Sequence, residues 1–196
     1  RVCAARGARC AGGLARPYIA YRFLRAHACT QAQRLRRPPA RGREQLRGRG
    51  RRTQGLPALL ASGRLERIGK MKTLQAFLLK DARQHLYSAV LLQKSDDVNG
   101  AFQLAYDSTR KSCAALLAHH GLRVTSRGGH FALINCAREL SLSIGELYSE
   151  INDLRQLRNA IEYPIDADRS PSNDRLSYSI ALAERVLALV SAEVAS

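Results

Sequence analysis

The chain has 196 residues, of which 32 are Lys or Arg and 16 are Asp or Glu, so its formal net charge at pH 7 is +16. This length suits one domain of ordinary size together with a tail. No stretch approaches the roughly 20 apolar residues of a membrane-spanning helix, so we expect a cytoplasmic protein with no membrane partner. The five cysteines include no CxxC pair, and we expect neither a metal site nor a cofactor.

The positive charge is confined to the first third of the chain. Residues 1–70 hold 18 Lys and Arg residues against two acids, whereas residues 71–196 are neutral. Arg, Ala, Gly, Leu and Pro predominate in this first third, as they do when GC-rich DNA is translated upstream of a true start. We therefore expect residues 1–55 to be a disordered or non-native upstream segment. The alternatives are a basic arm that holds nucleic-acid phosphates by charge, and a processed leader.

Apolar residues recur periodically from residue 56 onward, so residues 56–196 are predicted to form one helical domain. The leucines of 56–60 indicate a short leading helix that ends near Gly63 or Gly69. Apolar positions at three- and four-residue steps then predict an amphipathic helix over 71–93.

The ends of a second long helix are marked by capping residues. Ser95 and Asp96 are its predicted N-caps. His119 and His120 fall in its last turn, and Gly121 follows as the expected stop. We interpret the two histidines as cations at a helix end and not as metal ligands.

A third and a fourth helix follow the pair of glycines at 128–129. The third runs from these glycines to Leu140. Ser143 with Glu146 three positions later forms a capping box, which predicts the start of the fourth helix.

Pro164 ends the fourth helix, because proline disfavours helical geometry in the residue before it. The polar segment 165–174 is a predicted loop, and residues 176–190 form the last helix. No window alternates with period two for long enough to predict a strand. The fold class is therefore all-α, a bundle of four to five helices behind a short leading helix.

The segment 154–164, LRQLRNAIEYP, is the most informative part of the domain. Arg158 lies along its apolar stripe, four residues after Leu154 and three before Ile161. A buried guanidinium needs a partner or a wet cleft. Arg158 is therefore either in a surface ion pair with Glu162 at i,i+4 spacing, or part of a functional cleft.

This segment resembles HEPN domains, which are helical bundles that commonly dimerise. Active members are metal-independent ribonucleases, marked by an Arg, a polar residue such as Asn and, a few positions later, a His. Arg158-Asn159 resembles the start of this mark. The tripeptides at 105–107 (AYD), 121–123 (GLR) and 128–130 (GGH) resemble those of an actinobacterial subfamily in which RNxxEYP replaces the ending with His.

The resemblance covers about residues 56–192. It implies a domain with a HEPN-like fold that acts on RNA or binds it. Tyr163 occupies the histidine position of the motif. Tyrosine, with an unperturbed pKa of about 10, is poorly suited to move protons at neutral pH. We therefore expect a domain that binds nucleic acid or a protein partner without catalysis. The alternative is a metal-independent endoribonuclease of a toxin–antitoxin or defence system that uses Arg158.

His130 is a further candidate because two glycines place it at a helix N-terminus, where backbone N–H groups attract anions. The alternative is a capping or core histidine beside a glycine turn. Asp107 and Arg110, spaced i,i+3, are either cleft residues or a surface pair. The expected partners are RNA, a cognate protein and a second copy of the chain in a homodimer.

The predicted site residues fall into three groups. The catalytic candidates are Arg158, Asn159, Glu162, Tyr163 and His130. The phosphate-binding candidates are Arg123, Arg127 and Arg155. The cleft candidates are Tyr106, Asp107 and Arg110.

Overall fold

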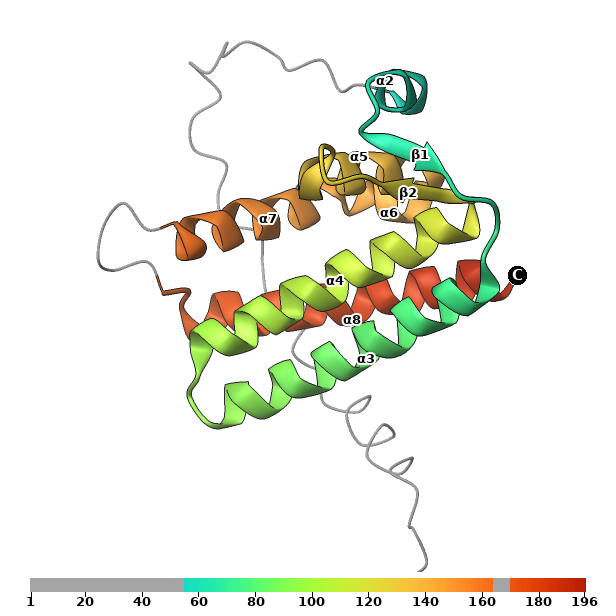
Figure 1. Cartoon of the computed structure of the whole chain (residues 1–196). Helices are drawn as coiled ribbons and strands as arrows, with labels where there is room; N and C mark the ends of the chain where they lie inside the picture. Colours follow the sequence, from blue (N-terminus) through green and yellow to red (C-terminus); the bar gives the residue numbers. More distant parts are fainter. Residues whose placement is uncertain (1–54, 164–169) are drawn as a thin grey trace, which may run out of the picture. The chain divides into compact units, whose positions relative to one another are not determined.

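The longest helices are α3 (Lys72–Lys94), α4 (Val98–His119) and α8 (Asn173–Ala195). They lie side by side in a computed structural model that describes residues 55–163 and 170–196 (Figure 1). α4 is the central helix, because α3, α8, α5 and α7 all pack against it. The predicted all-α bundle is therefore confirmed. The expectations for residues 1–54 and 164–169 lie outside the described residues. The predicted loop over 165–174 is too long at its end, because α8 already begins at Asn173, where the Oγ of the N-cap Ser172 accepts a hydrogen bond from the backbone N–H of Arg175 at 3.2 Å.

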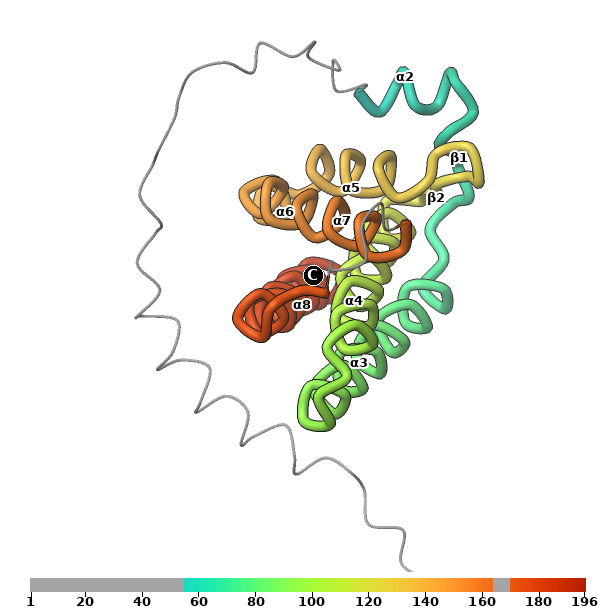
Figure 2. Tube along the Cα trace, turned by 90° about the vertical axis from the view of Figure 1, so that its left-hand side faces the viewer, coloured from blue at the N-terminus to red at the C-terminus, as the bar shows by residue number. Residues whose placement is uncertain are grey.

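Three shorter helices cover another side of α4. They are α5 (Gly129–Leu140), α6 (Leu142–Glu146) and α7 (Tyr148–Glu162). Both α5 and α7 contact α4, and they also contact each other (Figure 2). α5 and α7 therefore pack against each other and against the same central helix.

The predicted fourth helix begins earlier than expected and is divided. Ser141 caps α6, because its Oγ accepts a hydrogen bond from the backbone N–H of Ile144 at 3.4 Å. Ser143 is therefore inside α6, and the expected capping box is wrong. α6 and α7 meet at Leu147, whose ψ of 4° departs from helical geometry.

The N-cap of α4 is Asp97, and the predicted caps Ser95 and Asp96 are wrong. The carboxylate of Asp97 accepts a hydrogen bond from the backbone N–H of Gly100 at 2.9 Å. Ser95 instead ends α3, and Asp96 has a φ of +60°. Both residues that were predicted as caps therefore lie in the turn between α3 and α4, before the N-cap of α4.

Two short strands that the sequence did not predict pair in an antiparallel sheet. β1 (Leu65–Arg67) follows the confirmed leading helix α2 (Leu56–Ala61), and β2 (Leu122–Val124) follows α4. Glu66 faces Arg123 in the register, and the Nε of Arg123 donates a hydrogen bond to a carboxylate oxygen of Glu66 at 2.6 Å. Three-residue strands are too short to show an alternating pattern.

The end of α4 confirms its predicted stop. His119 is the last helical residue, His120 is the C-cap, and Gly121 has a φ of +70°. A glycine adopts this left-handed conformation without steric cost, so the chain turns from α4 directly into β2.

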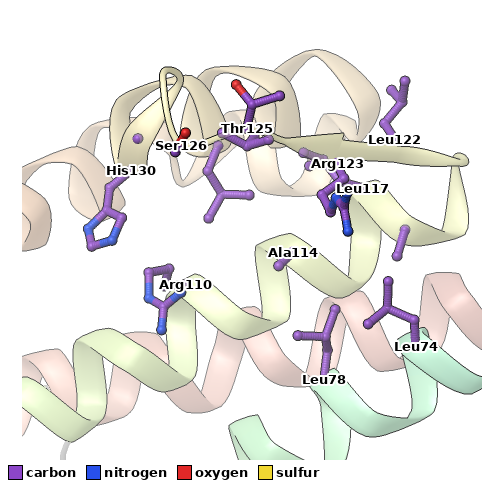
Figure 3. A pocket seen from close by; sticks show the side chains of 14 residues that line it. Leu74, Leu78, Arg110, Ala114, Leu117, Leu122, Arg123, Thr125, Ser126 and His130 are labelled. Carbon is purple, nitrogen blue, oxygen red and sulfur yellow. The ribbon is translucent and has the colours of Figure 1, made fainter. Parts of the chain in front are cut away.

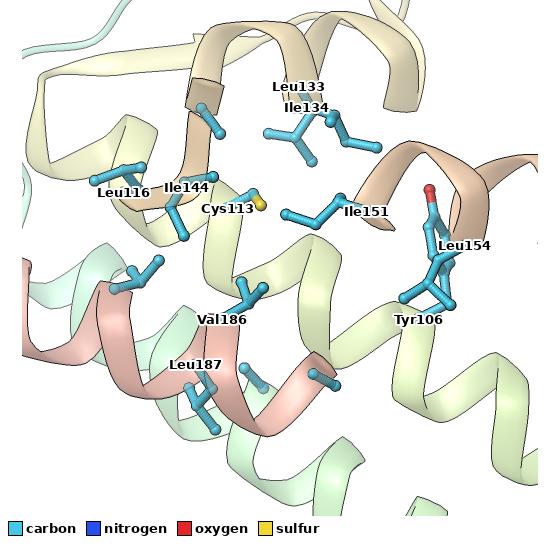
Figure 4. Packing of buried hydrophobic residues seen from close by; sticks show 14 of the residues in the cluster. Tyr106, Cys113, Leu116, Leu133, Ile134, Ile144, Ile151, Leu154, Val186 and Leu187 are labelled. Carbon is cyan, nitrogen blue, oxygen red and sulfur yellow. The ribbon is translucent and has the colours of Figure 1, made fainter. Parts of the chain in front are cut away.

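The helices enclose one apolar core, part of which Figure 4 shows. The largest fully buried side chains include Tyr106, Phe102 and Leu116 on α4, with Ile151 and Leu154 on α7. A buried tyrosine usually hydrogen-bonds through its hydroxyl. Tyr106 therefore carries a polar group into the apolar region where α4, α5 and α7 meet.

Candidate functional site

Side chains of three helices meet on one side of the central helix. α4 and α7 each supply several of the predicted site residues, and the first turn of α5 supplies one. The residues that converge are Tyr106, Asp107, Arg110, His130, Arg155, Arg158 and Glu162.

A hydrogen bond between Tyr106 and His130 lies at the centre of the site. The hydroxyl of Tyr106 is 2.9 Å from Nδ1 of His130. Tyr106 is 1% exposed, and burial raises the pKa of its phenol, which therefore stays protonated. The phenol can then donate to Nδ1. In that arrangement the proton of the neutral imidazole sits on Nε2, an assignment inferred from the hydrogen bond.

Positive charge surrounds this pair. Burial lowers the pKa of His130, and the charges of Arg110 and Arg158 lower it further, against the opposing charge of Asp107. Arg155 acts on the imidazole in the same direction and also acts on the phenol of Tyr106. Three guanidinium groups from two helices therefore act on one hydrogen-bonded pair.

The two glycines before His130 fix its position. A Cβ on Gly128 would lie 2.5 Å from the backbone oxygen of Arg64 and 2.5 Å from a methyl group of Val124. Gly129 has a φ of +60°, where other residues are strained. The glycine turn expected from the sequence is thus present, and it directs His130 toward α4.

Arg158 forms the ion pair with Glu162 that its i,i+4 spacing offered as one of two alternatives. Its Nη2 is 3.6 Å from Oε1 of Glu162, and the two side chains are 22% and 37% exposed. The same carboxylate oxygen accepts a hydrogen bond from Nε2 of Gln103 at 2.7 Å. The carboxylate of Glu162 therefore interacts with Arg158 on its own helix and with Gln103 on α4. Its ion pair with the Arg158 guanidinium, at 3.6 Å, is the weaker of the two contacts.

The other two arginines are held differently. Nε and Nη2 of Arg155 donate to the amide oxygen of Asn152 at 3.2 and 3.1 Å, and the guanidinium lies 5.4 Å from the ring centre of Phe131. An amide oxygen carries no charge, so this contact orients Arg155 without neutralising it. Arg110 donates from Nε to Asp107 at 2.8 Å, which confirms the expected i,i+3 pair.

A chain of polar side chains behind Asp107 was missed by the sequence prediction. His85 Nδ1 is 3.8 Å from Asp107, and His85 Nε2 is 3.4 Å from Nζ of Lys111, which pairs with Asp81. A lysine can only donate, so Nε2 of His85 is the acceptor in its contact with Lys111. The hydrogen bond from Lys111 lowers the pKa of Asp81. The i,i+4 spacing of Asp81 with His85 and of Asp107 with Lys111 was the available signal.

Four predicted residues lie apart from the Tyr106–His130 pair. Tyr163 is the C-cap of α7 and is 72% exposed, and Asn159 is also exposed. Arg123 is occupied by its cross-strand pair with Glu66. Arg127 is exposed in the turn before α5.

A cavity of about 420 Å³ adjoins the site. Figure 3 shows Arg110 and His130 near each other at one end of the cavity, with Leu74 and Leu78 of α3 at the other. Most of its lining is aliphatic. The lining side chains and glycine are Leu74, Leu78, Arg110, Ala114, Leu117, Ala118, Leu122, Arg123, Val124, Thr125, Ser126, Gly129, His130 and Leu133.

Residues 55–163 and 170–196 hold no group of three or more His, Cys, Asp or Glu side chains suited to a metal ion. Within the same ranges, every helix is too short or too polar to span a bilayer.

A family model described as HEPN domain matches residues 75–193. The match covers more than half of the chain and extends from the first turn of α3 nearly to the end of α8. No curated protein and no solved structure shows significant similarity to the chain.

Proposed function

Because the chain belongs to the HEPN domain family, we propose that its helical domain binds the phosphate backbone of RNA at Arg110, His130 and Arg158, without cleaving it. The observation that carries this proposal is the convergence of arginine charges on a half-buried, neutral histidine. Asp107 and Glu162 offset part of this charge, but the three arginines leave the cluster net positive, and their repulsion disfavours the imidazolium ion. A phosphate bound among these groups would relieve that repulsion.

Each group has a distinct part in holding a phosphate. Guanidinium groups donate paired hydrogen bonds that match two phosphate oxygens. The ion pair between Arg158 and Glu162 is long, at 3.6 Å, so the Arg158 guanidinium can turn toward an incoming anion. His130 adds a neutral donor, because the proton on its Nε2 is free while Nδ1 accepts from Tyr106.

The same hydrogen bond favours binding over catalysis. A general base needs an unprotonated nitrogen that faces the hydroxyl group it activates. With Nδ1 engaged by the buried phenol of Tyr106, the remaining nitrogen of neutral His130 carries a proton. Tyr163, at the histidine position of the motif, is 72% exposed and lies outside this buried pair.

A metal-independent endoribonuclease is the second candidate, and the position of His130 beside Arg158 favours it. If the imidazole donates from Nδ1 to the phenol oxygen instead, Nε2 is free to accept the proton of an RNA 2′-hydroxyl. The 2′-oxygen then bonds to phosphorus as the bond to the 5′-oxygen of the next nucleotide breaks, and that oxygen takes up a proton from water. Arg158 would stabilise the charge on the phosphate. A toxin–antitoxin or defence role belongs to this candidate.

One experiment separates the two candidates. The full chain and its Arg158→Gln and Arg110→Gln variants are incubated with mixed single-stranded RNA in EDTA and resolved on native and denaturing gels. Arg185→Gln, at an exposed position of α8, is the control for loss of one charge. We expect retarded, intact RNA, with affinity lowered by the two site variants and not by the control.

The other outcomes are equally informative. Cleavage by the full chain that Arg158→Gln abolishes would establish the ribonuclease and contradict binding without catalysis. Equal affinity of all four proteins for RNA would mean that RNA binds outside this site. The basic residues 1–70 could bind RNA in this way through their charge alone. The expected homodimer is a separate proposal, which light scattering on the same preparations would test.

A further inference from the structure

The cavity beside Arg110 and His130 has two chemically different parts. Its floor and walls are mostly aliphatic side chains from α3, α4, β2 and α5, and Arg123, which lies among them, is paired with Glu66. Its cationic end is the edge of the proposed phosphate site, where Arg110 and His130 lie near each other (Figure 3). A ligand that fits both parts has an anionic group joined to a flat or compact apolar body.

The size of the cavity fits such a ligand. At about 420 Å³ it is within the usual range of pockets that hold a small organic molecule. Its rim is polar, because Thr125 and the exposed Ser126 lie at the opening. The hydroxyl of Thr125 already donates to the backbone oxygen of Gly63 at 2.7 Å, so Ser126 supplies the free hydroxyl.

We propose that this cavity takes one base of a single-stranded RNA whose phosphate lies at Arg110 and His130. The inference rests on the proposed function, because the phosphate site supplies the anion-binding end. Unpaired bases bind in apolar pockets and stack on planar groups such as the guanidinium of an arginine. Arg110 belongs to both parts of the site, so it contacts the phosphate on one side and the base on the other.

The test compares RNA with an abasic oligonucleotide of the same length and charge. The full chain is titrated with both ligands, and binding is measured by fluorescence anisotropy. Base stacking on a protein contributes about 1–3 kcal/mol, so we expect RNA to bind about tenfold more tightly than the abasic strand. Equal affinity for the two strands would overturn the inference.

Variants that fill the cavity show whether the preference for RNA over the abasic strand arises there. Ala114→Phe fills it from the floor and Leu78→Trp from the α3 side. We expect either change to remove the preference for RNA and to leave binding of the abasic strand unchanged. Ala181→Phe, on an exposed position of α8, is the control. Circular dichroism checks the fold, and Leu78→Trp decides the result if Ala114→Phe does not fold.

The outcomes also separate this inference from the proposed function. If filling the cavity leaves both affinities unchanged, or lowers both equally, no base binds there and the inference is wrong. The proposed function stands in that case, provided that Arg110→Gln and Arg158→Gln still weaken binding of the abasic strand. If those two variants do not weaken binding, no phosphate binds at this site and the proposed function is wrong.

Discussion

The hydroxyl of Tyr106 lies 2.9 Å from Nδ1 of His130, and this hydrogen bond joins the central helix α4 to the first turn of α5. The phenol is buried and the imidazole is half-buried, so the bond satisfies two polar groups that have little access to water. The bond also decides which nitrogen of His130 can face a ligand. Several properties of the protein should therefore change when either partner is altered.

Removing the hydroxyl of Tyr106 should destabilise the domain without unfolding it. In Tyr106→Phe the aromatic ring still fills the core, but Nδ1 of His130 loses its donor. Leaving a buried polar group unpaired costs about 1–3 kcal/mol. We expect a decrease of that size in the free energy of unfolding, measured with urea. Tyr87→Phe, at a side chain that is 51% exposed, should change stability little. A loss no larger than this control's would mean that the bond contributes nothing.

The pKa of His130 should lie below its ordinary value of about 6.5. Burial is the main cause, and the charges of Arg110 and Arg158 add to it. A titration of the imidazole ring protons by NMR measures this pKa directly. In Arg110→Gln it should rise toward the ordinary value, whereas Arg185→Gln should leave it unchanged. A pKa above 6.5 in the full chain would contradict this arrangement of charges.

The helices were predictable because each long one buries a continuous stripe of apolar side chains. The expected helix over 71–93 differs from α3 by one residue at each end. The errors concern short-range hydrogen bonds, which several neighbouring residues can supply. Asp97 was preceded by two equally suitable caps, and Ser141 is a cap two residues before the predicted Ser143. The three-residue strands left no periodic signal at all.

The site was predictable only where its residues are close in sequence. The pairs of Arg158 with Glu162 and of Asp107 with Arg110 follow from helical spacing. Tyr106 and His130 were identified separately, but 24 positions separate them, and their bond depends on how α5 packs on α4. His85 was missed for the same reason, since its partners are on another helix.

The lowered pKa of His130 should make folding stability depend on pH. The unfolded chain takes up a proton at about pH 6.5, whereas folded His130 does so only at a lower pH. Between these two values the unfolded state binds more protons, so stability falls as the pH falls through this window. His120, whose pKa burial also lowers, contributes in the same direction. His130→Gln should therefore reduce the pH dependence of the urea midpoint between pH 7 and 5 without abolishing it. An unchanged dependence would rule out this role.

Gly128 should not tolerate a side chain. In Gly128→Ala the new methyl group would lie 2.5 Å from the backbone oxygen of Arg64, which cannot move without disturbing β1. Overpacking of this kind costs about 1–3 kcal/mol, and the first turn of α5 would shift with His130. We expect lower stability in urea together with weaker RNA binding. Gly63→Asn is the control, since that position has open space and asparagine tolerates its φ of +65°. A Gly128→Ala protein as stable as this control would contradict the close packing.

Binding of a phosphate at this site should strengthen as the pH falls through the lowered pKa of His130. The protonated imidazole adds a positive charge beside Arg110 and Arg158, and a bound phosphate in turn favours that proton. Because the two effects are linked, RNA affinity and the pKa of His130 must rise together. Anisotropy titrations of the full chain between pH 7.5 and 5.5 measure the first, and NMR with and without RNA measures the second. In His130→Gln the affinity should be nearly independent of pH, since the remaining cations at the site are arginines, which stay charged throughout this range. An equal pH dependence in this variant would mean that the titrating group is another residue of the chain.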